Sequence, residues 1–192
     1  MDSKGKIKQR LTEHQQTIDR ILADEHLLQQ VEQAVAVITD CFRKGGKVYF
    51  CGNGGSAADA QHLAAEFSGK FYLDRAVLPA EALHCNTSYL TAVSNDYSFD
   101  IIYARLICGI AHEGDVLVGL STSGNSSNIL KAFEVCREKN IQTIGFTGES
   151  GGKMKGVSDV LLNIPSTDTP RIQEAHITIG HILCEMVEAN IF

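Results

Sequence analysis

Apolar residues follow two different patterns along this chain. Near the N-terminus they recur at helical intervals among charged and amide side chains, which predicts amphipathic helices at about 7–23 and 25–43. Beyond the Gly45-Gly46 pair they gather in short continuous runs that end in glycine- or serine-rich turns. Runs of this kind are typical of strands buried on both faces of a parallel sheet.

The apolar runs alternate with further helical patterns. Strands are expected from Lys47 onward and at about 80–84, 115–120, 141–147 and 159–164, with helices at about 99–111, 128–139 and 171–189 and a short helix after Asn86. This order predicts an α/β fold in three layers, doubly wound in the Rossmann or flavodoxin manner, with a five-stranded parallel sheet and extra N-terminal helices. Ligands of such folds bind at the carboxyl ends of the strands.

The length and composition fit a single domain that binds small molecules. A chain of 192 residues is expected to form one domain over 1–192, with N-terminal helices to about residue 44 and an α/β core from about residue 45. The net charge of -6, without any cluster of Lys and Arg, argues against nucleic-acid binding. A phosphorylated metabolite needs only a few hydrogen-bond donors, so the acidic balance does not oppose it.

Cysteine usage and the lack of long apolar segments predict a cytoplasmic protein. The six cysteines show no CxxC spacing and mostly lie in apolar surroundings, as reduced core residues do. The polar N-terminus has no apolar leader, and no segment approaches the length that spans a membrane. We therefore expect no membrane partner and no disulfide framework.

The first glycine-rich turn is followed by a candidate reactive pair. Gly52, Gly54 and Gly55 permit a turn that aims several N–H groups at one anion, and Ser56 is expected to cap the helix that follows. His62 and Glu66 have i,i+4 spacing, which places imidazole and carboxylate on one helix face, where they could share a proton-transfer site or a metal. An ordinary turn before a solvated His–Glu pair explains the same residues.

This turn fits the dinucleotide-binding pattern GxGxxG poorly. Ala57 takes the third glycine position, and no acidic residue lies at the expected end of the next strand. Nucleotide binding is therefore disfavoured.

A second loop gathers hydroxyl groups at the start of a helix. Four hydroxyl side chains surround Gly124, namely Ser121, Thr122, Ser123 and Ser126. A helix N-terminus with convergent hydroxyls can hold a phosphate dianion without a basic residue, although a generously capped helix gives the same pattern. The loop lacks the GK[ST] ending of a Walker motif.

The last predicted helix carries Gln173, His176 and His181. Gln173 and His181 are separated by about 12 Å of helical rise, so they can meet at one small site only by reaching from either side. His176 is more typical of a core or surface histidine.

Three segments in this order, GNGGSAADAQH, STSGNS and RIQEAHI, resemble the sugar isomerase (SIS) domain family and, within it, the phosphoheptose isomerases. The similarity runs from about residue 25 to the C-terminus. It implies conversion of sedoheptulose 7-phosphate into D-glycero-D-manno-heptose 7-phosphate, the first step toward the ADP-heptose of the lipopolysaccharide core. It also implies a cytoplasmic homotetramer with active sites at subunit interfaces and one zinc ion (Zn2+) per subunit.

The resemblance also implies roles for individual residues. Glu66 and His181 match the catalytic base and acid, and the zinc ligands correspond to His62, Glu66, Gln173 and His181. The substrate-binding positions correspond to Asn53, Gly54, Gly55, Glu66, Asn95, Asp96, Ser121, Thr122, Ser123, Ser126 and Gln173. Among them, the four residues with hydroxyl side chains match the phosphate site.

Two other functions compete with this one. A related SIS-domain scaffold associates with the replication initiator DnaA, but it lacks the carboxylate and the imidazole that Glu66 and His181 supply here. A protein acting on a hexosamine phosphate is the second alternative, and the match to the phosphoheptose isomerases is closer. The sequence therefore favours the enzyme. The apolar stripes of the N-terminal helices are expected to pack against another subunit.

Overall fold

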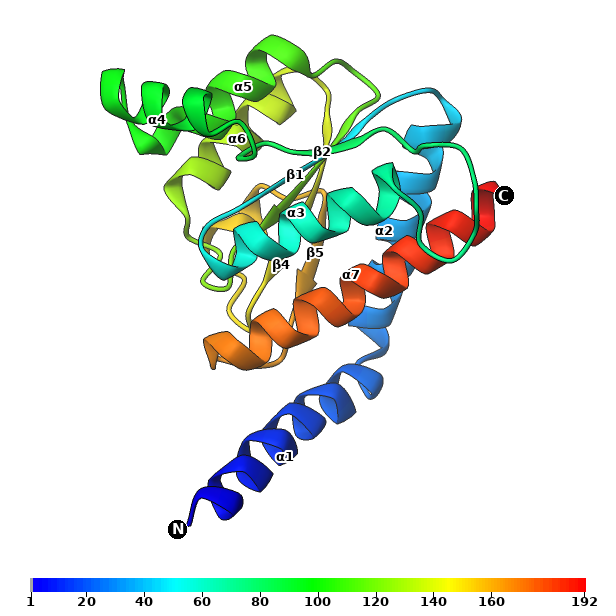
Figure 1. Ribbon diagram of the computed structural model, residues 1–192, viewed down its shortest axis with the longest axis vertical. Coiled ribbons are helices and arrows are strands. Elements are labelled where there is room, and N and C mark those ends of the chain that lie inside the picture. The colour runs from blue at the N-terminus through cyan, green and yellow to red at the C-terminus, as the bar shows by residue number, and fades with distance from the viewer. Residues whose placement is uncertain (1) are drawn as a thin grey trace.

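The computed structural model describes residues 2–192 and contains one five-stranded parallel sheet (Figure 1). The strands are β1 (Val48–Gly52), β2 (Ala80–Ala82), β3 (Val116–Leu120), β4 (Gln142–Thr147) and β5 (Val160–Asn163), in the order β2-β1-β3-β4-β5. Every residue of the two neighbouring strands β1 and β3 is buried. The prediction of a doubly wound parallel sheet is confirmed, because the chain winds outward from β1 in both directions.

Within the described residues 2–192, seven α-helices and two short 3-10 helices connect and flank the strands. The α-helices are α1 (Ser3–Leu22), α2 (Glu25–Arg43), α3 (Gly55–Ser68), α4 (Thr87–Asp96), α5 (Ile102–Ile110), α6 (Ser127–Glu138) and α7 (Thr169–Ile191). The 3-10 helices are η1 (Phe99–Ile101) and η2 (Gly152–Gly156). The helix expected at about 99–111 is thus divided into η1 and α5.

The helices cover the sheet in two layers, which completes the predicted three-layer architecture. Successive residues of β1 point to opposite faces: Val48 and Phe50 pack with α2, α3 and α7, whereas Tyr49 and Cys51 pack with α5 and α6. Figure 1 shows α3 and α7 side by side on one face of the sheet, and their contact creates the site described below.

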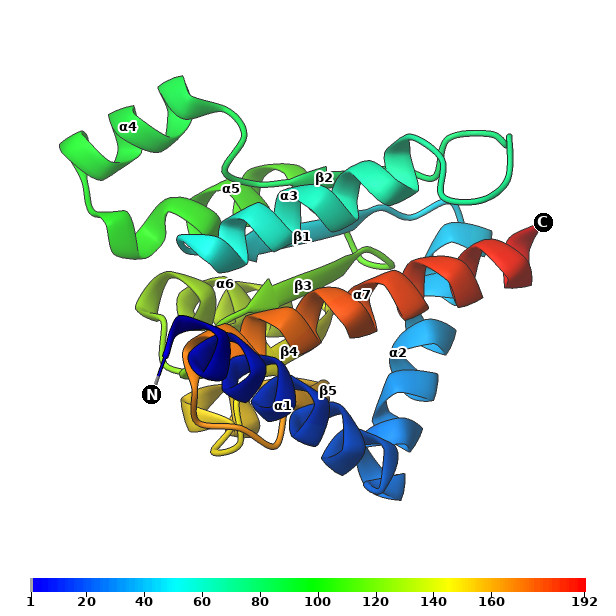
Figure 2. The same cartoon turned by 60° about the horizontal axis from the view of Figure 1, so that its bottom comes forward.

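The N-terminal helix α1 projects from this body. Asp2 caps it by accepting a hydrogen bond of 2.7 Å from the Gly5 N–H. Figure 2 shows α1 passing alongside the N-terminal half of α7, where His14 Nδ1 lies 2.8 Å from a Glu174 carboxylate oxygen. Ile7 and Leu11 of α1 remain exposed. The expected packing of the N-terminal helices on another subunit stays a prediction.

Within residues 2–192, no helix combines the length and apolar character needed to cross a membrane. All six cysteines are free thiols, and four of them are buried, as expected of reduced core residues.

Candidate active site

The turn between β1 and α3 is shaped by its glycines. A Cβ on Gly52 would lie 2.3 Å from the Ser56 carbonyl oxygen, so only glycine lets the chain turn so closely. The prediction that Ser56 caps α3 is wrong. Gly54 occupies the N-cap position with φ of +56°, no side chain caps the helix, and Ser56 lies inside its first turn as a buried residue. The N–H groups at the start of α3 are therefore left without a side-chain acceptor.

Asn53, in the same turn, is held in place by a residue that the sequence patterns did not single out. Its side-chain amide exchanges two hydrogen bonds, of 3.0 and 2.9 Å, with the amide of Asn128 in the first turn of α6. Asn128 is only 2 % exposed, and its Oδ1 also accepts a bond of 3.0 Å from the Ile129 N–H. Since β1 and β3 are neighbours, this amide pair joins the glycine turn after β1 to the start of α6, which directly follows the hydroxyl-rich loop.

The hydroxyl-rich loop between β3 and α6 brings three of its predicted side chains together. Ser121 Oγ lies 2.8 Å from Ser126 Oγ and 3.5 Å from Ser123 Oγ. Ser126 is the N-cap residue of α6, but its hydroxyl faces Ser121 and does not bond the helix amides. Thr122 and Ser123 line an adjacent cleft of about 300 Å³. Hydroxyl groups thus surround the positive end of the α6 dipole.

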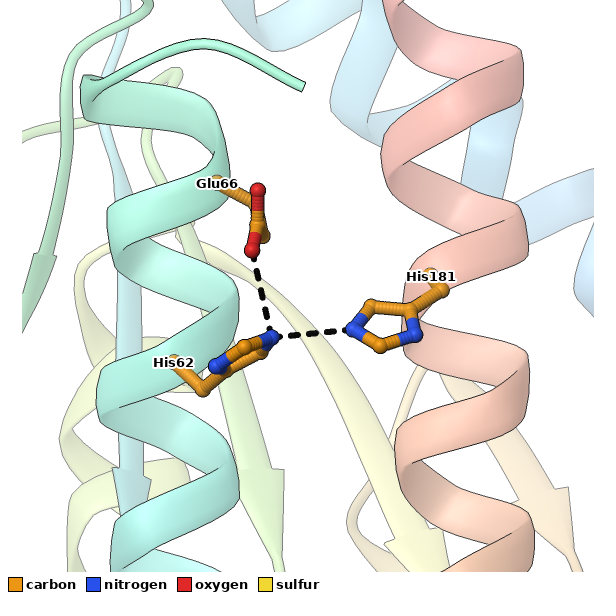
Figure 3. Close-up of side chains that lie close together, drawn as sticks. All are labelled: His62, Glu66 and His181. Atoms are coloured by element: carbon orange, nitrogen blue, oxygen red, sulfur yellow. Dashed lines mark hydrogen bonds and ion pairs between the residues drawn. The ribbon is translucent and has the colours of Figure 1, made fainter. Parts of the chain in front are cut away.

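The contact between α3 and α7 gathers His62, Glu66 and His181 (Figure 3). His62 Nε2 lies 3.1 Å from Glu66 Oε1 and 2.9 Å from His181 Nε2. Figure 3 shows the His62 ring between the other two groups, with His62 and Glu66 on α3 and His181 on α7. The site opens to solvent, because the side chain of His62 is 50 % exposed and that of Glu66 is 23 % exposed.

A close approach of the two helices makes this cluster possible. Gly180 packs against Leu63 of α3, and a Cβ on Gly180 would lie 2.6 Å from both terminal carbons of Leu63. His181 follows Gly180 directly and is carried to α3 by this contact. No local sequence pattern marked Gly180 or Leu63, because their pairing is visible only once the helices pack.

The donor set of this cluster fits a metal ion. The ligating atoms of the three residues all lie within 4.8 Å of one another. One imidazole nitrogen cannot donate a single hydrogen to both neighbours, whereas a cation would satisfy all three groups. The two contact distances of 2.9 and 3.1 Å are close to the ligand–ligand separation of about 3.3 Å in a tetrahedral zinc site.

The other predicted site residues lie apart from this cluster. The Gln173 amide lies against Gly55, about two helical turns before His62 along α3. Asn95 and Asp96 end α4, are exposed, and hydrogen-bond to each other at 2.9 Å. Within residues 2–192, no hydrogen bond joins this pair to the loops or to the histidine cluster. Within a single chain, Gln173 therefore lies beside the glycine turn. The Asn95–Asp96 pair lies at the end of α4.

Comparisons with known proteins identify the family. The family model of the SIS domain matches residues 11–148. The chain belongs to the SIS domain family. Among similar SIS proteins, the phosphoheptose isomerase of Aneurinibacillus thermoaerophilus is 51 % identical over 91 % of this chain and 88 % of its own length. That of Rhodospirillum rubrum is 58 % identical over 82 % of this chain and 84 % of its own length.

A solved SIS structure has the same arrangement of elements. The phosphoheptose isomerase of Neisseria gonorrhoeae superimposes with a TM-score of 0.92 at 38 % identity, covering 98 % of this chain and 100 % of the other. This agreement extends to the N-terminal helices, because almost the whole chain is matched.

In this SIS domain, His176 is a core residue and stands apart from the cluster. It is fully buried, its Nε2 lies 3.1 Å from the Thr147 carbonyl oxygen, and its ring meets Phe146 edge-on. Burial lowers the pKa of His176 to about 4, so its ring is neutral near pH 7. Of the two alternatives expected for His176, a core or a surface histidine, the core histidine is confirmed.

Proposed function

We propose that this chain converts sedoheptulose 7-phosphate into D-glycero-D-manno-heptose 7-phosphate. The observation that carries the proposal is the meeting of the Glu66 carboxylate and the His181 imidazole around His62, at distances of 3.1 and 2.9 Å. The relatives named phosphoheptose isomerase, at 51 % and 58 % identity, support the choice of substrate. The proposal includes the expected role on the way to ADP-heptose and the expected cytoplasmic location.

The chemistry requires two proton carriers of different kinds. Moving a carbonyl between C1 and C2 means removing a proton from the neighbouring carbon and returning one, through an enediol. Glu66 is assigned as the base that takes and returns the carbon proton. His181 is assigned to the oxygens, because an imidazole can both donate and accept a proton near pH 7.

The two loops at the carboxyl ends of β1 and β3 are assigned to the substrate. The phosphate is held by Ser121, Thr122, Ser123 and Ser126 with the N-terminus of α6. Gly54 and Gly55 allow the sugar to approach the backbone closely, and Asn53 contacts it through an amide that Asn128 orients. Gln173, which lies at Gly55, is assigned to the same side of the sugar. Asn95 and Asp96 are expected to contact substrate as well.

A zinc ion bound by His62, Glu66 and His181 is part of the proposal, supported by the convergence of their ligating atoms. Bound there, Zn2+ would act as a Lewis acid toward the substrate oxygens. The place of Gln173 as a fourth ligand stays a prediction, since in one chain its amide lies beside Gly55.

The proposal also includes a homotetramer with active sites at subunit interfaces. It is supported by the exposed apolar side chains along α1 and α7, which include Leu11, Leu22 and Ile182. A homotetramer would also allow Asn95 and Asp96 to contact the active site of a neighbouring subunit.

The direct test is an assay of the purified protein with sedoheptulose 7-phosphate, in which the aldose product is followed by NMR. Conversion without any added enzyme partner is expected. No turnover, together with specific capture of DnaA, would favour the scaffold function, which is disfavoured because Glu66 and His181 are both present and meet.

A further inference from the structure

A second polar cluster lies next to the proposed active site, where the segment between α3 and β2 folds over α7. The segment wraps around the C-terminal part of α7 in Figure 1 and closes onto one carboxylate, that of Glu188. The N–H groups of Phe71, Tyr72 and Leu73 donate to this carboxylate at 3.2, 2.8 and 2.9 Å. Arg75 Nε adds a fourth bond of 2.6 Å.

This carboxylate is buried and charged. The side chains of Arg75 and Glu188 are 2 % and 3 % exposed. Burial alone would raise the pKa of Glu188, but the hydrogen bonds from Leu73, Arg75, Tyr72 and Phe71 together hold it below its ordinary value. A buried charge with this many donors is a rigid anchor, because losing any donor leaves part of the charge unsatisfied.

Arg75 uses its remaining donors to close the end of α3. Its Nη2 donates to the Glu66 carbonyl oxygen at 3.0 Å, and its Nη1 donates to the Phe67 and Ala76 carbonyl oxygens at 2.9 and 3.0 Å. The last carbonyls of a helix lack partners within it, and a cation there complements the helix dipole. Arg75 thus holds the backbone of the helical turn that carries the Glu66 side chain.

The same segment also contacts the other proposed catalytic group. The ring of Phe71, whose N–H is bound by Glu188, lies with its centroid 5.8 Å from that of His181. Glu188 itself lies on α7, about two turns beyond His181. The ion pair therefore connects, through Arg75 to Glu66 and through Phe71 to His181, the two side chains that must meet.

We propose that the Arg75–Glu188 ion pair is a positioning device for the catalytic pair, which holds the Glu66 turn and the His181 ring in register across the α3–α7 contact. The inference rests on the proposed isomerase function. It assigns no contact with substrate to either residue. The phosphate loop between β3 and α6 makes no hydrogen bond with the pair, so substrate affinity should depend little on it.

The test compares kcat, KM and the unfolding midpoint in Arg75→Lys, Glu188→Gln and Phe71→Leu. Lys keeps the charge of Arg75 but cannot reach the carboxylate and the helix carbonyls at once. Phe71→Leu leaves the ion pair intact and keeps the test informative if both polar variants fail to fold. Ile107→Val in α5 is the matched control, because it removes buried atoms from the core cluster on the other face of the sheet, away from α3 and α7.

We expect kcat for sedoheptulose 7-phosphate to fall about tenfold or more in the folded variants, with KM within about twofold of the wild-type value. The control should lose stability without losing kcat. Unchanged kcat in the folded variants, or equal losses in the control, would overturn the proposal.

Hydrogen exchange separates this proposal from the proposed function. Backbone amides of residues 64–76 should exchange faster in Arg75→Lys than in the wild type, while those of β3 and β4 should not. Were the wild-type protein inactive on the substrate, the isomerase assignment would fall. Unchanged exchange at 64–76 would instead show that the ion pair positions nothing.

Discussion

The Nε2 atoms of His62 and His181 lie 2.9 Å apart although 119 residues separate them in the chain. The i,i+4 spacing of His62 and Glu66 brings two members of the cluster together within one helix, but the third depends on how closely α7 approaches α3. That approach is set by Gly180 against Leu63.

Gly180→Ala should damage the site by moving one helix. The added Cβ would lie 2.6 Å from Leu63, so α7 must shift and carry His181 with it. We expect a stability loss of about 1–3 kcal/mol, as for other overpacked cores, and at least a tenfold drop in kcat. Urea unfolding and steady-state kinetics measure the two effects.

Gly109→Ala is the matched control for this change. Gly109 also lies in a helix, and a Cβ there would meet nothing within 4 Å. It should leave kcat unchanged and slightly raise stability. Wild-type kcat in Gly180→Ala would show that the close helix contact does not position His181.

Glu66→Gln and His181→Ala should each abolish isomerisation. Each removes one proton carrier, and such groups typically contribute 100- to 10,000-fold to a rate, so we expect losses of about that size. Circular dichroism and the elution volume should stay those of the wild type. Glu185→Gln serves as the control, because it removes an exposed carboxylate from α7, the helix that carries His181. Substantial activity in either variant would contradict the acid–base assignment.

His62→Ala should weaken zinc binding. The variant removes the nitrogen that lies between the other two ligating atoms, and we expect zinc affinity to fall by about tenfold or more. Zinc titration followed by calorimetry, independent of turnover, measures this affinity. Retention of wild-type zinc affinity would exclude the cluster as the metal site.

Gln173→Ala distinguishes its two predicted roles. If Gln173 contacts the substrate beside Gly55, the substitution should raise KM and leave zinc affinity unchanged. A loss of zinc affinity comparable to that of His62→Ala would place it in the ligand set and require its amide to reach the cluster from elsewhere.

The fold was more predictable than the site, for physical reasons. Continuous apolar runs marked the strands because both faces of this sheet are covered by helices. The cap of α3 was misassigned because Gly54, with a positive φ, takes the N-cap position two residues before Ser56. The supporting residues Asn128, Arg75 and Glu188 could not be found locally, since each acts through a partner distant in the sequence.

Asn128→Ala should impair the substrate side of the site. Without its partner amide, Asn53 loses two hydrogen bonds and its orientation, and the buried Ile129 N–H loses its side-chain acceptor. We expect a stability loss of about 1–3 kcal/mol and a raised KM. A double-mutant cycle with Asn53→Ala measures the coupling of the pair. Strict additivity of the two changes in KM would show that Asn128 does not orient Asn53.

Acid should destabilise the protein through His176, because this side chain is buried in its neutral form. The pKa of His176 is lowered from 6.5 to about 4 in the folded state because burial disfavours its charged form. The unfolded chain therefore binds the proton first as pH falls, and stability is present above pH 6.5 and lost progressively between pH 6.5 and pH 4. At pH 5 the loss attributable to this residue is about 2 kcal/mol relative to pH 7.5.

His176→Gln isolates this contribution, because the amide can still donate to the Thr147 carbonyl but does not titrate. The free energy of unfolding, measured in urea at pH 7.5 and pH 5, should fall by about 2 kcal/mol less in the variant than in the wild type. All other carboxylates and histidines titrate in both proteins, so their contributions cancel in the difference. Equal losses in the two proteins would mean that His176 is already protonated in the folded state at pH 5, and that its site is less shielded from solvent than the packing of β4 against α7 indicates.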